Sequence, residues 1–357
     1  MTGGKRWQPT WIFGRQWDVF ITLSWLPVFV ASHILVHLPG ALGLSMLRHI
    51  IVLALLISFL HQPLTFGLIY GDAAQIKLHR RLFVVAPMLA IAVAVVAAVN
   101  RWWIVIPVAA IWNLQHTLQQ RYGIERIYAG RSGYGSARLD RAISYVPMVA
   151  VLAAVAALPG TESLATRASL DPMNAGAIHL LVTVRPVATV ITVFAGLATL
   201  VVLAAAVRQE VDAGSKANPA KWFYQLSSIA MLVAIVVDPA AGFIAYVASH
   251  ALEYAVVVDR TAKRRYAGGV GVETERRHRS LLSTVATHAP GRVGFFVLIV
   301  LGSLAAYTKV RGPSLNAIVY TVGALHFTYD AVIWKLRKPV VAKDFAIAPR
   351  EATLARS

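Results

Sequence analysis

Four histidines lie inside apolar stretches of this sequence, where an ionisable side chain is costly unless it binds something. They are His61, His116, His250 and His326. Polar groups in such stretches commonly mark ion or substrate sites. Two carboxylates accompany them, because Glu253 follows His250 by three residues and Asp330 follows His326 by four. Both spacings place the two side chains on one helix face, so we predict that these six residues form a metal site.

The ligand types indicate which metal this site would take. Mixed imidazole and carboxylate ligands suit borderline and hard divalent ions, and a histidine one turn from a carboxylate recurs in helix-built di-iron sites. We therefore predict one or two non-haem iron ions. His79, before Arg80 and Arg81, is either a further ligand at the mouth of the site or an ordinary interfacial residue. Tyr254 directly follows Glu253, Tyr329 directly precedes Asp330, and both tyrosines are predicted to donate protons in catalysis.

Each of these residues also has a simpler interpretation. A single histidine or carboxylate within a membrane most often hydrogen-bonds a neighbouring helix. Six such residues at one level are harder to explain in this way, which favours a functional site. His33 and His37, four residues apart near the other end of a span, form either a separate site or an interfacial pair.

The composition indicates what kind of element positions these residues. Of the 357 residues, 57% are hydrophobic and only 14% are charged, against about 25% charged in a soluble domain. A chain this apolar needs the bilayer as its solvent, and its long apolar runs lack strand alternation, so they predict transmembrane helices. Because the chain has no cysteine, iron–sulfur clusters, thiolate-bound haem, c-type haem and disulfides are excluded.

Ten segments are long enough to cross a membrane as helices. They lie at 18–38, 47–70, 82–100, 102–120, 142–158, 186–207, 222–237, 239–259, 291–308 and 314–334. We predict an all-α polytopic helix bundle forming a single transmembrane domain over 1–357, with an N-terminal tail at 1–17 and a C-terminal tail at 335–357. A tight turn is expected at Asp238-Pro239, and a short surface helix within 159–185.

The basic residues indicate an orientation. Most of the 34 Lys and Arg residues fall on one side if both termini are cytoplasmic, as the positive-inside rule requires. Their position in short loops accounts for the net charge of +18 without nucleic acid as a partner. We predict the inner (plasma) membrane of a bacterium. His61, His250 and His326 would then lie about 13 Å below the cytoplasmic helix ends, and His116 about 8 Å.

A metal layer at this depth would meet apolar substrates from the side and oxygen from the membrane. Iron held by histidine and carboxylate activates oxygen. We therefore predict a membrane-bound metal-dependent oxidoreductase that hydroxylates, desaturates or oxidatively cleaves a lipid or isoprenoid. Its partners would be membrane lipids, a hydrophobic small-molecule substrate and an electron-donor protein.

Three other functions remain open at this point. Two facing histidines, such as His61 with His116 or His250 with His326, can ligate haem b, although a haem needs no carboxylate beside them. A transporter or proton pathway would use the same buried groups, yet the sequence lacks the repeated, interrupted segments common in transporters. Zinc-assisted hydrolysis also fits these ligands.

The layout resembles one known family. Scattered histidines within the spans, and the pattern His326-x-x-x-Asp330 near a helix end, are similar to the Brp/Blh family of membrane carotene oxygenases. The resemblance covers the general architecture and that one short pattern. It implies histidine-bound iron and cleavage of carotene to retinal. The His-x-x-His-His boxes of membrane fatty-acid desaturases are absent from the sequence, which argues against that family.

Overall fold

A computed structural model describes residues 9–169, 174–267, 288–309 and 313–347, and these residues form helices without any strand. The helices are α1 (Arg15–Leu23), α2 (Trp25–Val36), α3 (Gly40–His61), α4 (Pro63–Tyr70), α5 (Ala73–Leu78), α6 (Arg80–Val99), α7 (Val105–Ser132), α8 (Ala137–Ala157), α9 (Thr161–Ala168), α10 (Asn174–Ala213), α11 (Pro219–Val237), α12 (Pro239–Ala262), α14 (Ala289–Lys309), α15 (Pro313–Ile333) and α16 (Pro339–Asp344). The all-α prediction is confirmed for this part of the chain.

Seven helical stretches are both long enough and apolar enough to cross a membrane. They are Arg15–Val36, Leu42–Tyr70, Arg80–Val99, Ala137–Ala157, Asn174–Lys216, Pro219–Val237 and Pro239–Arg265. The remaining predicted spans, at 102–120, 291–308 and 314–334, are helical in α7, α14 and α15 but do not belong to these seven. The helices are compatible with an integral membrane protein. The count of ten and the cytoplasmic position of both termini remain predictions.

The surface of the long helices is apolar. On α10 the side chains of Phe194, Val201 and Val211 are 69%, 69% and 74% exposed. Large apolar side chains in contact with water would be unfavourable, and such continuous surfaces are typical of contact with lipid or another protein. This surface is the one that a bilayer would cover.

Capping residues fix where several helices begin. Ser136 accepts a hydrogen bond from the amide of Leu139 at the start of α8. Asn218 accepts one from the amide of Ala220 and precedes Pro219 at the first position of α11. Both arrangements satisfy amides that a helix start leaves without a partner. The tight turn predicted at Asp238 is found between α11 and α12, and α9 is the predicted short helix within 159–185.

The helices group into two units, each built from separate parts of the chain. The first unit comprises Met1–Val52, Leu114–Ser249 and Lys335–Ser357, and the second comprises Leu53–Asn113 and His250–Trp334. Three of the four unit boundaries fall within α3, α7 and α12, and the fourth follows α15. The single domain expected from the sequence stays a prediction, and each unit is described by itself.

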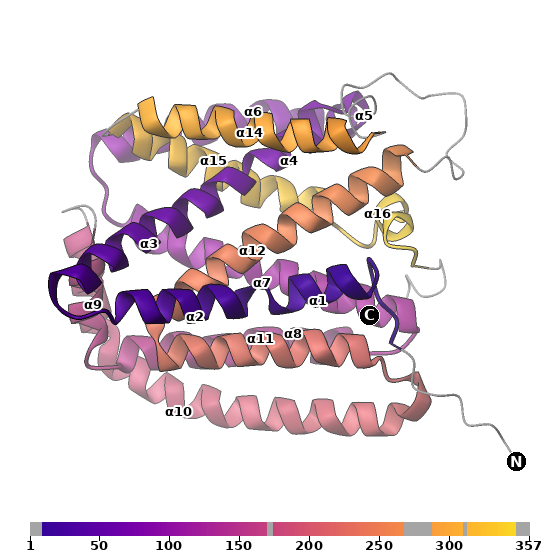
Figure 1. Ribbon diagram of the computed structural model, residues 1–357, viewed down its shortest axis with the longest axis horizontal. Coiled ribbons are helices and arrows are strands. Elements are labelled where there is room, and N and C mark those ends of the chain that lie inside the picture. Colours follow the sequence, from indigo (N-terminus) through magenta and orange to yellow (C-terminus); the bar gives the residue numbers. More distant parts are fainter. Residues whose placement is uncertain (1–8, 170–173, 268–287, 310–312, 348–357) are drawn as a thin grey trace, which may run out of the picture. The chain divides into compact units, whose positions relative to one another are not determined.

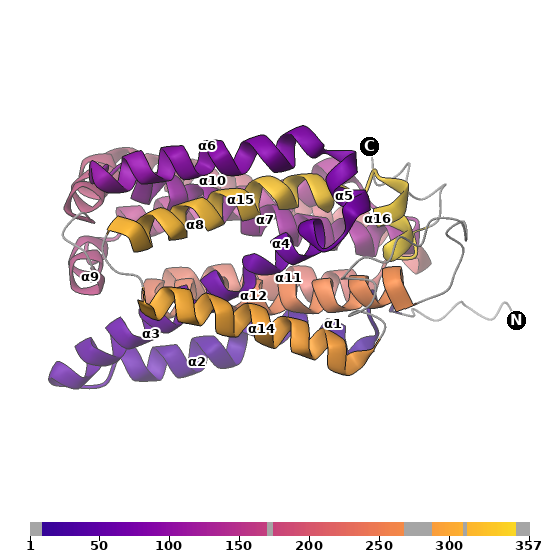
Figure 2. The same ribbon diagram turned by 90° about the horizontal axis from the view of Figure 1, so that it is seen from above.

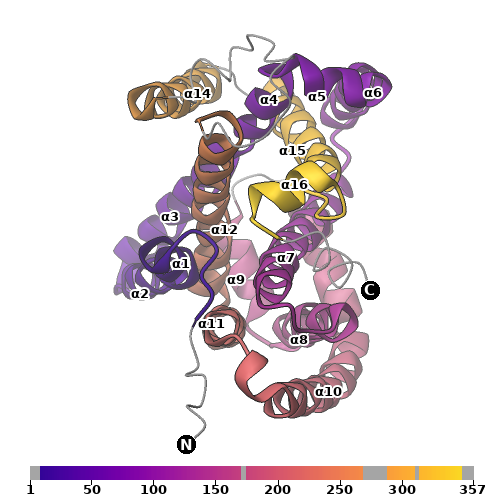
Figure 3. The ribbon, with the colours of Figure 1, turned by 90° about the vertical axis from the view of Figure 1, so that its right-hand side faces the viewer.

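In the first unit, α8 lies alongside α10 and α11, while α1 and α2 contact α11 (Figure 1, Figure 3). Its core includes Trp25, Met148, Met231 and Tyr246. Gly242 lets the start of α12 approach α11 at backbone distance, because a Cβ atom there would lie 2.4 Å from the Cα of Ile235. The turn that carries Asp238 is therefore held tightly.

In the second unit, α15 packs along α6, and α4 contacts both α14 and α15 (Figure 2). The apolar core of this unit contains Leu64, Leu68, Ile69, Phe83, Tyr254, Val258, Leu325, Tyr329 and Ile333. These residues come from α4, α6, α12 and α15. The packing brings the end of α3, the start of α4 and one face each of α12 and α15 together, and that junction contains the candidate site.

Candidate metal centre

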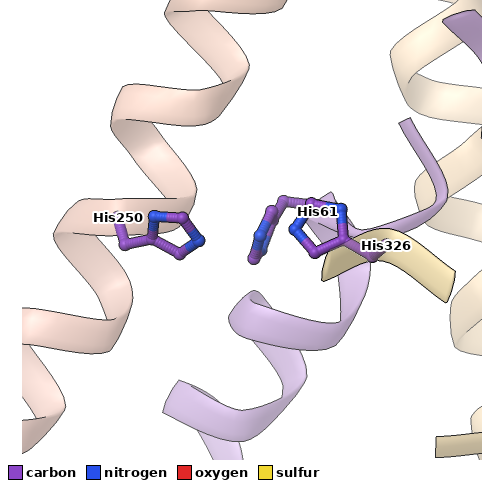
Figure 4. A group of neighbouring side chains, drawn as sticks. All are labelled: His61, His250 and His326. Atoms are coloured by element: carbon purple, nitrogen blue, oxygen red, sulfur yellow. The ribbon is translucent and has the colours of Figure 1, made fainter. Parts of the chain in front are cut away.

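Three of the four predicted intramembrane histidines meet in the second unit. His61 ends α3, His250 lies on α12 and His326 lies on α15, and their exposed fractions are 5%, 1% and 0%. One ring nitrogen from each lies within 4.8 Å of the others. Figure 4 shows the ring of His61 between the other two. Its centroid is 4.9 Å from each neighbouring ring, with interplanar angles of 90° and 83°. These three residues are called the three-histidine group below.

A proline explains why His61 ends its helix. Pro63 has no amide hydrogen to donate to the residue four positions earlier, so the helical hydrogen-bond pattern is interrupted there. The amide of Thr65 instead bonds the carbonyl of Gln62, at 3.2 Å, as in a tighter turn. The α3–α4 break therefore lies beside His61, where a change in helix direction can aim a side chain inward.

The hydroxyl of Thr65 organises the side of His326 that faces away from His61. Thr65 is fully buried. Its Oγ1 lies 2.7 Å from Nδ1 of His326 and donates a 2.9 Å hydrogen bond to Oδ1 of Asp330. A threonine hydroxyl has only one proton, so its oxygen must accept from Nδ1–H of His326. This tautomer places the lone pair of His326 on Nε2, the arrangement that a metal-bound histidine needs.

Asp330 and Tyr254 complete this hydrogen-bonded chain. Oδ1 of Asp330 accepts a 2.9 Å hydrogen bond from the hydroxyl of Tyr254, which is also 2.6 Å from the hydroxyl of Thr65. The other carboxylate oxygen of Asp330 is 3.8 Å from Nδ1 of His326, which is too far for a hydrogen bond. Asp330 therefore lies behind His326, in the position of a residue that orients a ligand. Its predicted role as a direct ligand remains untested.

The other residues predicted from the sequence lie in varied surroundings. Glu253 is fully buried on α12, one turn after His250. His79 precedes α6, and its ring is 6.1 Å from that of Phe83. The hydroxyl of Tyr329 lies 2.8 Å from the hydroxyl of Tyr70. None of the three belongs to the three-histidine group as the described residues define it.

His116 is buried on α7 and belongs to the first unit. Its predicted participation in the metal site, like that of Glu253 and His79, stays a prediction. The predicted catalytic roles of Tyr254 and Tyr329 are also untested, although Tyr254 lies close to the group. Its ring centroid is 5.4 Å from that of His61 and 5.2 Å from that of His326.

Thr65 is the central residue that sequence reasoning missed. It follows His61 by four residues, a spacing that can place two side chains on one helix face. Hydroxyl residues are frequent in membrane helices, where many bond their own helix backbone. The spacing alone therefore carries little information, and the contacts of Thr65 with α12 and α15 become visible only in three dimensions.

The donor set fits a divalent transition metal. Neutral imidazoles suit iron, zinc, copper and nickel. Nitrogens that share one ion at about 2.1 Å cannot be more than about 4.2 Å apart, so modest rotations of the three rings would bring them into ligating positions. The residues present therefore fit one ion held by three histidines, with Thr65 and Asp330 orienting one of them.

Comparisons with known proteins add no family or relative. No protein-family model, no curated protein and no solved structure matches the chain. The resemblance to the Brp/Blh family consequently stays a prediction, and a function has to be argued from the residues themselves.

Proposed function

We propose that this chain is an integral membrane oxidoreductase whose three-histidine group binds non-haem iron and which oxidises an apolar lipid or isoprenoid. One observation carries the proposal. Imidazoles from three separate helices, each almost completely buried, offer nitrogens within 4.8 Å of one another. Bound iron would supply the capacity to activate oxygen.

The surroundings of His61 support a bound ion over a purely structural role. Both ring nitrogens of His61 are buried, and the backbone groups of Ile57 and Ser58 that approach its ring belong to its own helix and do not reach it with normal hydrogen-bond geometry. Leaving a polar atom buried in this way costs about 1–3 kcal/mol. A metal ion bound to one of these nitrogens would offset that cost, whereas ring packing alone would not.

The apolar packing beside the site favours oxidation over hydrolysis. The three rings lie beside the apolar core of the second unit, which includes Leu64, Leu325 and Tyr254. Molecular oxygen dissolves readily in such surroundings, and water does not. Hydrolysis by a zinc centre would need water as a reactant at this position, so we place it behind oxidation.

The chemistry of oxidation divides into two cases. Oxidative cleavage of a carbon–carbon double bond uses both atoms of O₂, one for each of two new carbonyl groups, and needs no external electrons. Hydroxylation and desaturation each consume two further electrons and therefore need an electron-donor protein. Cleavage is the simplest case for a chain acting alone, and it is also the reaction that the Brp/Blh resemblance implies.

The chain's own residues have separate tasks in this proposal. His61, His250 and His326 hold the ion. Thr65 fixes the tautomer of His326 by accepting from its Nδ1–H, and Asp330 accepts the hydrogen bond that the hydroxyl of Thr65 donates. The hydroxyl of Tyr254 donates a hydrogen bond to the carboxylate of Asp330 and keeps that carboxylate in place.

A b-type haem fits this geometry less well. Two axial histidines must stand on opposite faces of a flat macrocycle. A third imidazole with a nitrogen within 4.8 Å of both others would occupy space that the macrocycle needs. The proton-pathway alternative requires no bound metal at all, so metal content separates it from the proposal.

Metal analysis and an absorption spectrum of the detergent-purified protein test the proposal. We expect about one iron ion per chain from this ligand set, lost in His250→Ala and in His326→Ala. His49 is a matched control because it is exposed and bonds its own helix at Ser45, so His49→Ala should retain the iron. A Soret band would indicate haem, bound zinc would indicate a hydrolase, and active metal-free protein would refute a metal centre.

A first substrate probe is β-carotene in detergent micelles, compared with a monounsaturated phospholipid. With ¹⁸O₂, cleavage should place one labelled atom in each carbonyl product. If iron-containing protein incorporated ¹⁸O into products of neither substrate, oxidation of these two substrate classes would be contradicted. The proposal of a metal centre would not be affected by that result.

A further inference from the structure

A second group of metal-ligating side chains lies in the first unit, at Asp238 between α11 and α12. Its Oδ2 is 2.7 Å from Nδ1 of His33 and 2.9 Å from Nε2 of His37. His33 lies in the last turn of α2, and His37 is the residue that ends it. Two histidines four residues apart therefore face one carboxylate oxygen from a different part of the chain.

The carboxylate of Asp238 is held in a fixed orientation. Its other oxygen, Oδ1, accepts hydrogen bonds of 3.1 Å from the amides of Ala240 and Ala241 at the start of α12. One oxygen thus caps the helix, and the other is directed at the imidazoles. Such support of a ligand by a second set of hydrogen bonds is typical of metal sites.

The histidine side of the group is also ordered. The ring of His33 stacks on that of Phe29, with centroids 5.8 Å apart and an interplanar angle of 18°. The rings of His33 and His37 are 4.7 Å apart. Trp25 anchors the start of α2 to α11 through a 2.8 Å hydrogen bond to Ser227, so the helix that carries both histidines is fixed to α11 near its first residue.

We propose that His33, His37 and Asp238 form a second divalent-metal site, distinct in chemistry from the three-histidine group. Its three ligand atoms lie within 4.8 Å of one another. Two histidines in an i, i+4 pair on a helix are a common half of a zinc site, and a carboxylate supplies the third ligand. Water would complete a four-coordinate zinc ion.

Exposure and charge separate this site from the three-histidine group. The side chains of His33 and His37 are 47% and 62% exposed, while that of Asp238 is 7% exposed. Because the two histidines lie at the end of the candidate span Arg15–Val36, an ion at the membrane–water interface could reach the imidazoles. The anionic ligand also offsets part of the ion's charge, which the three neutral imidazoles of the other group cannot do.

The alternative is a clamp made only of hydrogen bonds. In that state Nδ1 of His33 and Nε2 of His37 would both carry protons and donate them to Asp238. A metal ion would displace those two protons and cross-link the end of α2 to the α11–α12 turn. The two states predict different responses to added zinc, since only the metal site gains stability from it.

Zinc titration of the detergent-purified full-length protein tests the proposal. Asp238→Asn is the decisive variant because asparagine keeps the cap on Ala240 and Ala241 but removes the anionic ligand. We expect zinc affinity to fall at least about tenfold in Asp238→Asn and in His37→Gln. We expect zinc to raise the melting temperature of the wild type and not that of Asp238→Asn or His37→Gln. His49→Ala should behave as wild type.

The titration must be kept separate from the three-histidine group. In a His250→Ala background, the site proposed here should still bind one zinc ion, and Asp238→Asn should in turn leave the iron content unchanged. Equal zinc affinity and an equal melting-temperature shift in the wild type and Asp238→Asn would overturn the proposal. That result would leave the iron centre untouched, and loss of the iron centre would leave this site untouched.

Discussion

Both units of the chain bury polar side chains, but the first unit pairs opposite charges and the second gathers side chains of one type. In the first unit Arg126, Asp140 and Lys221 are no more than 2% exposed. Asp140 accepts a 2.5 Å hydrogen bond from Arg126 and a 2.6 Å hydrogen bond from Lys221, one on each carboxylate oxygen. In the second unit the three-histidine group gathers side chains of one chemical type, all of them bases.

The difference separates a structural polar cluster from a candidate binding site. Each oxygen of Asp140 is engaged by a cation, so an added ion would have to displace an existing partner. In the three-histidine group, His326 is held from behind through Thr65, and one ring nitrogen of each residue converges with the others. Burial of polar groups is therefore a poor sign of function by itself. Convergence of like ligands is the informative feature, because a single added cation can bind all of them at once.

The largest effect should come from breaking the charge cluster of Arg126, Asp140 and Lys221. Asp140→Ala would leave two buried cations without their shared carboxylate. Removing one partner of a buried ion pair typically costs about 3–5 kcal/mol. We expect a loss of that size in the free energy of unfolding, measured by denaturant titration in detergent.

The control for Asp140→Ala is an ion pair on the surface. Asp212 and Arg208 are 4.0 Å apart on α10, with side chains 69% and 86% exposed. Exposed pairs of this kind contribute about 0–1 kcal/mol, so Asp212→Ala should leave stability nearly unchanged. A loss under about 1 kcal/mol for Asp140→Ala would mean that the charge cluster is not the structural element described here.

A smaller but specific effect is expected from Thr65→Val, which keeps the shape of the side chain and removes its hydroxyl. Nδ1 of His326 would lose the group that fixes its tautomer, and removal of such supporting partners typically lowers metal affinity about 10–100-fold. Competition with a chelator would measure the change. Thr65→Ser should restore affinity.

Thr328 provides the matched control for Thr65. It lies on α15, and its hydroxyl donates to the carbonyl of Ala324 in its own helix. Thr328→Val therefore removes a hydroxyl near the same region without touching His326, and metal affinity should stay at the wild-type value. Equal losses in both variants would show that helix packing, and not the tautomer, controls binding.

Much of the second unit was predictable because its signals are local. Apolar runs identified the helices, and the positions of His61, His250 and His326 within those runs placed them at one level. The role of Thr65 depends on contacts with α12 and α15, which no local pattern encodes. The relation of His116 to the group was likewise a long-range inference, and it stays untested.

Three basic residues of the first unit do not lie in loops, where the orientation argument places the cations of this chain. They are Arg121, Arg126 and Lys221. The structure places them on α7 and α11, no more than 3% exposed. Composition cannot distinguish a solvated arginine from one paired with a distant aspartate, since the pairing partner Asp140 lies on another helix. The predicted orientation therefore rests on fewer cations than the sequence suggested.

The pH dependence of stability tests whether Glu125, whose pKa is affected by Asp140 of the charge cluster, is protonated in the folded protein. Glu125 lies beyond the predicted span 102–120 and accepts a 2.9 Å hydrogen bond from Ser144. Burial, with the negative charge of Asp140 adding to it, raises the pKa of Glu125 from 4.5 to about 8. The folded state then holds a proton that the unfolded state releases, so the contribution of Glu125 is fully present below pH 4.5 and is lost as the pH rises to about 8.

Glu125→Gln imitates the protonated form and should remove this dependence. In the wild type, stability should fall by up to about 1.4 kcal/mol per pH unit within that window, measured by denaturant titration at pH 5, 6.5 and 8. The variant should give a flatter profile. Glu162→Gln is the control, because the side chain of Glu162 is 48% exposed. A wild-type stability that rises with pH across this window would contradict the neutral state of Glu125.

The smallest change in stability, and the sharpest test of the contrast between the units, is expected from His61→Leu. Leucine is similar in size and adds no polar atom to a buried position. The ring of His61 is approached only weakly by backbone groups of its own helix. Replacing such a weakly satisfied buried polar group by an apolar one is nearly neutral or stabilising, so the metal-free variant should unfold within about 1 kcal/mol of the metal-free wild type. The bound iron should nevertheless be lost.

The control for His61→Leu is Leu64→Ala, in the same core. It should cost about 2–5 kcal/mol, which would show that the assay detects packing defects there. If His61→Leu instead lost as much stability as Asp140→Ala, His61 would be a structural residue like Asp140, because its ring would then have protein partners whose loss matters without any ion.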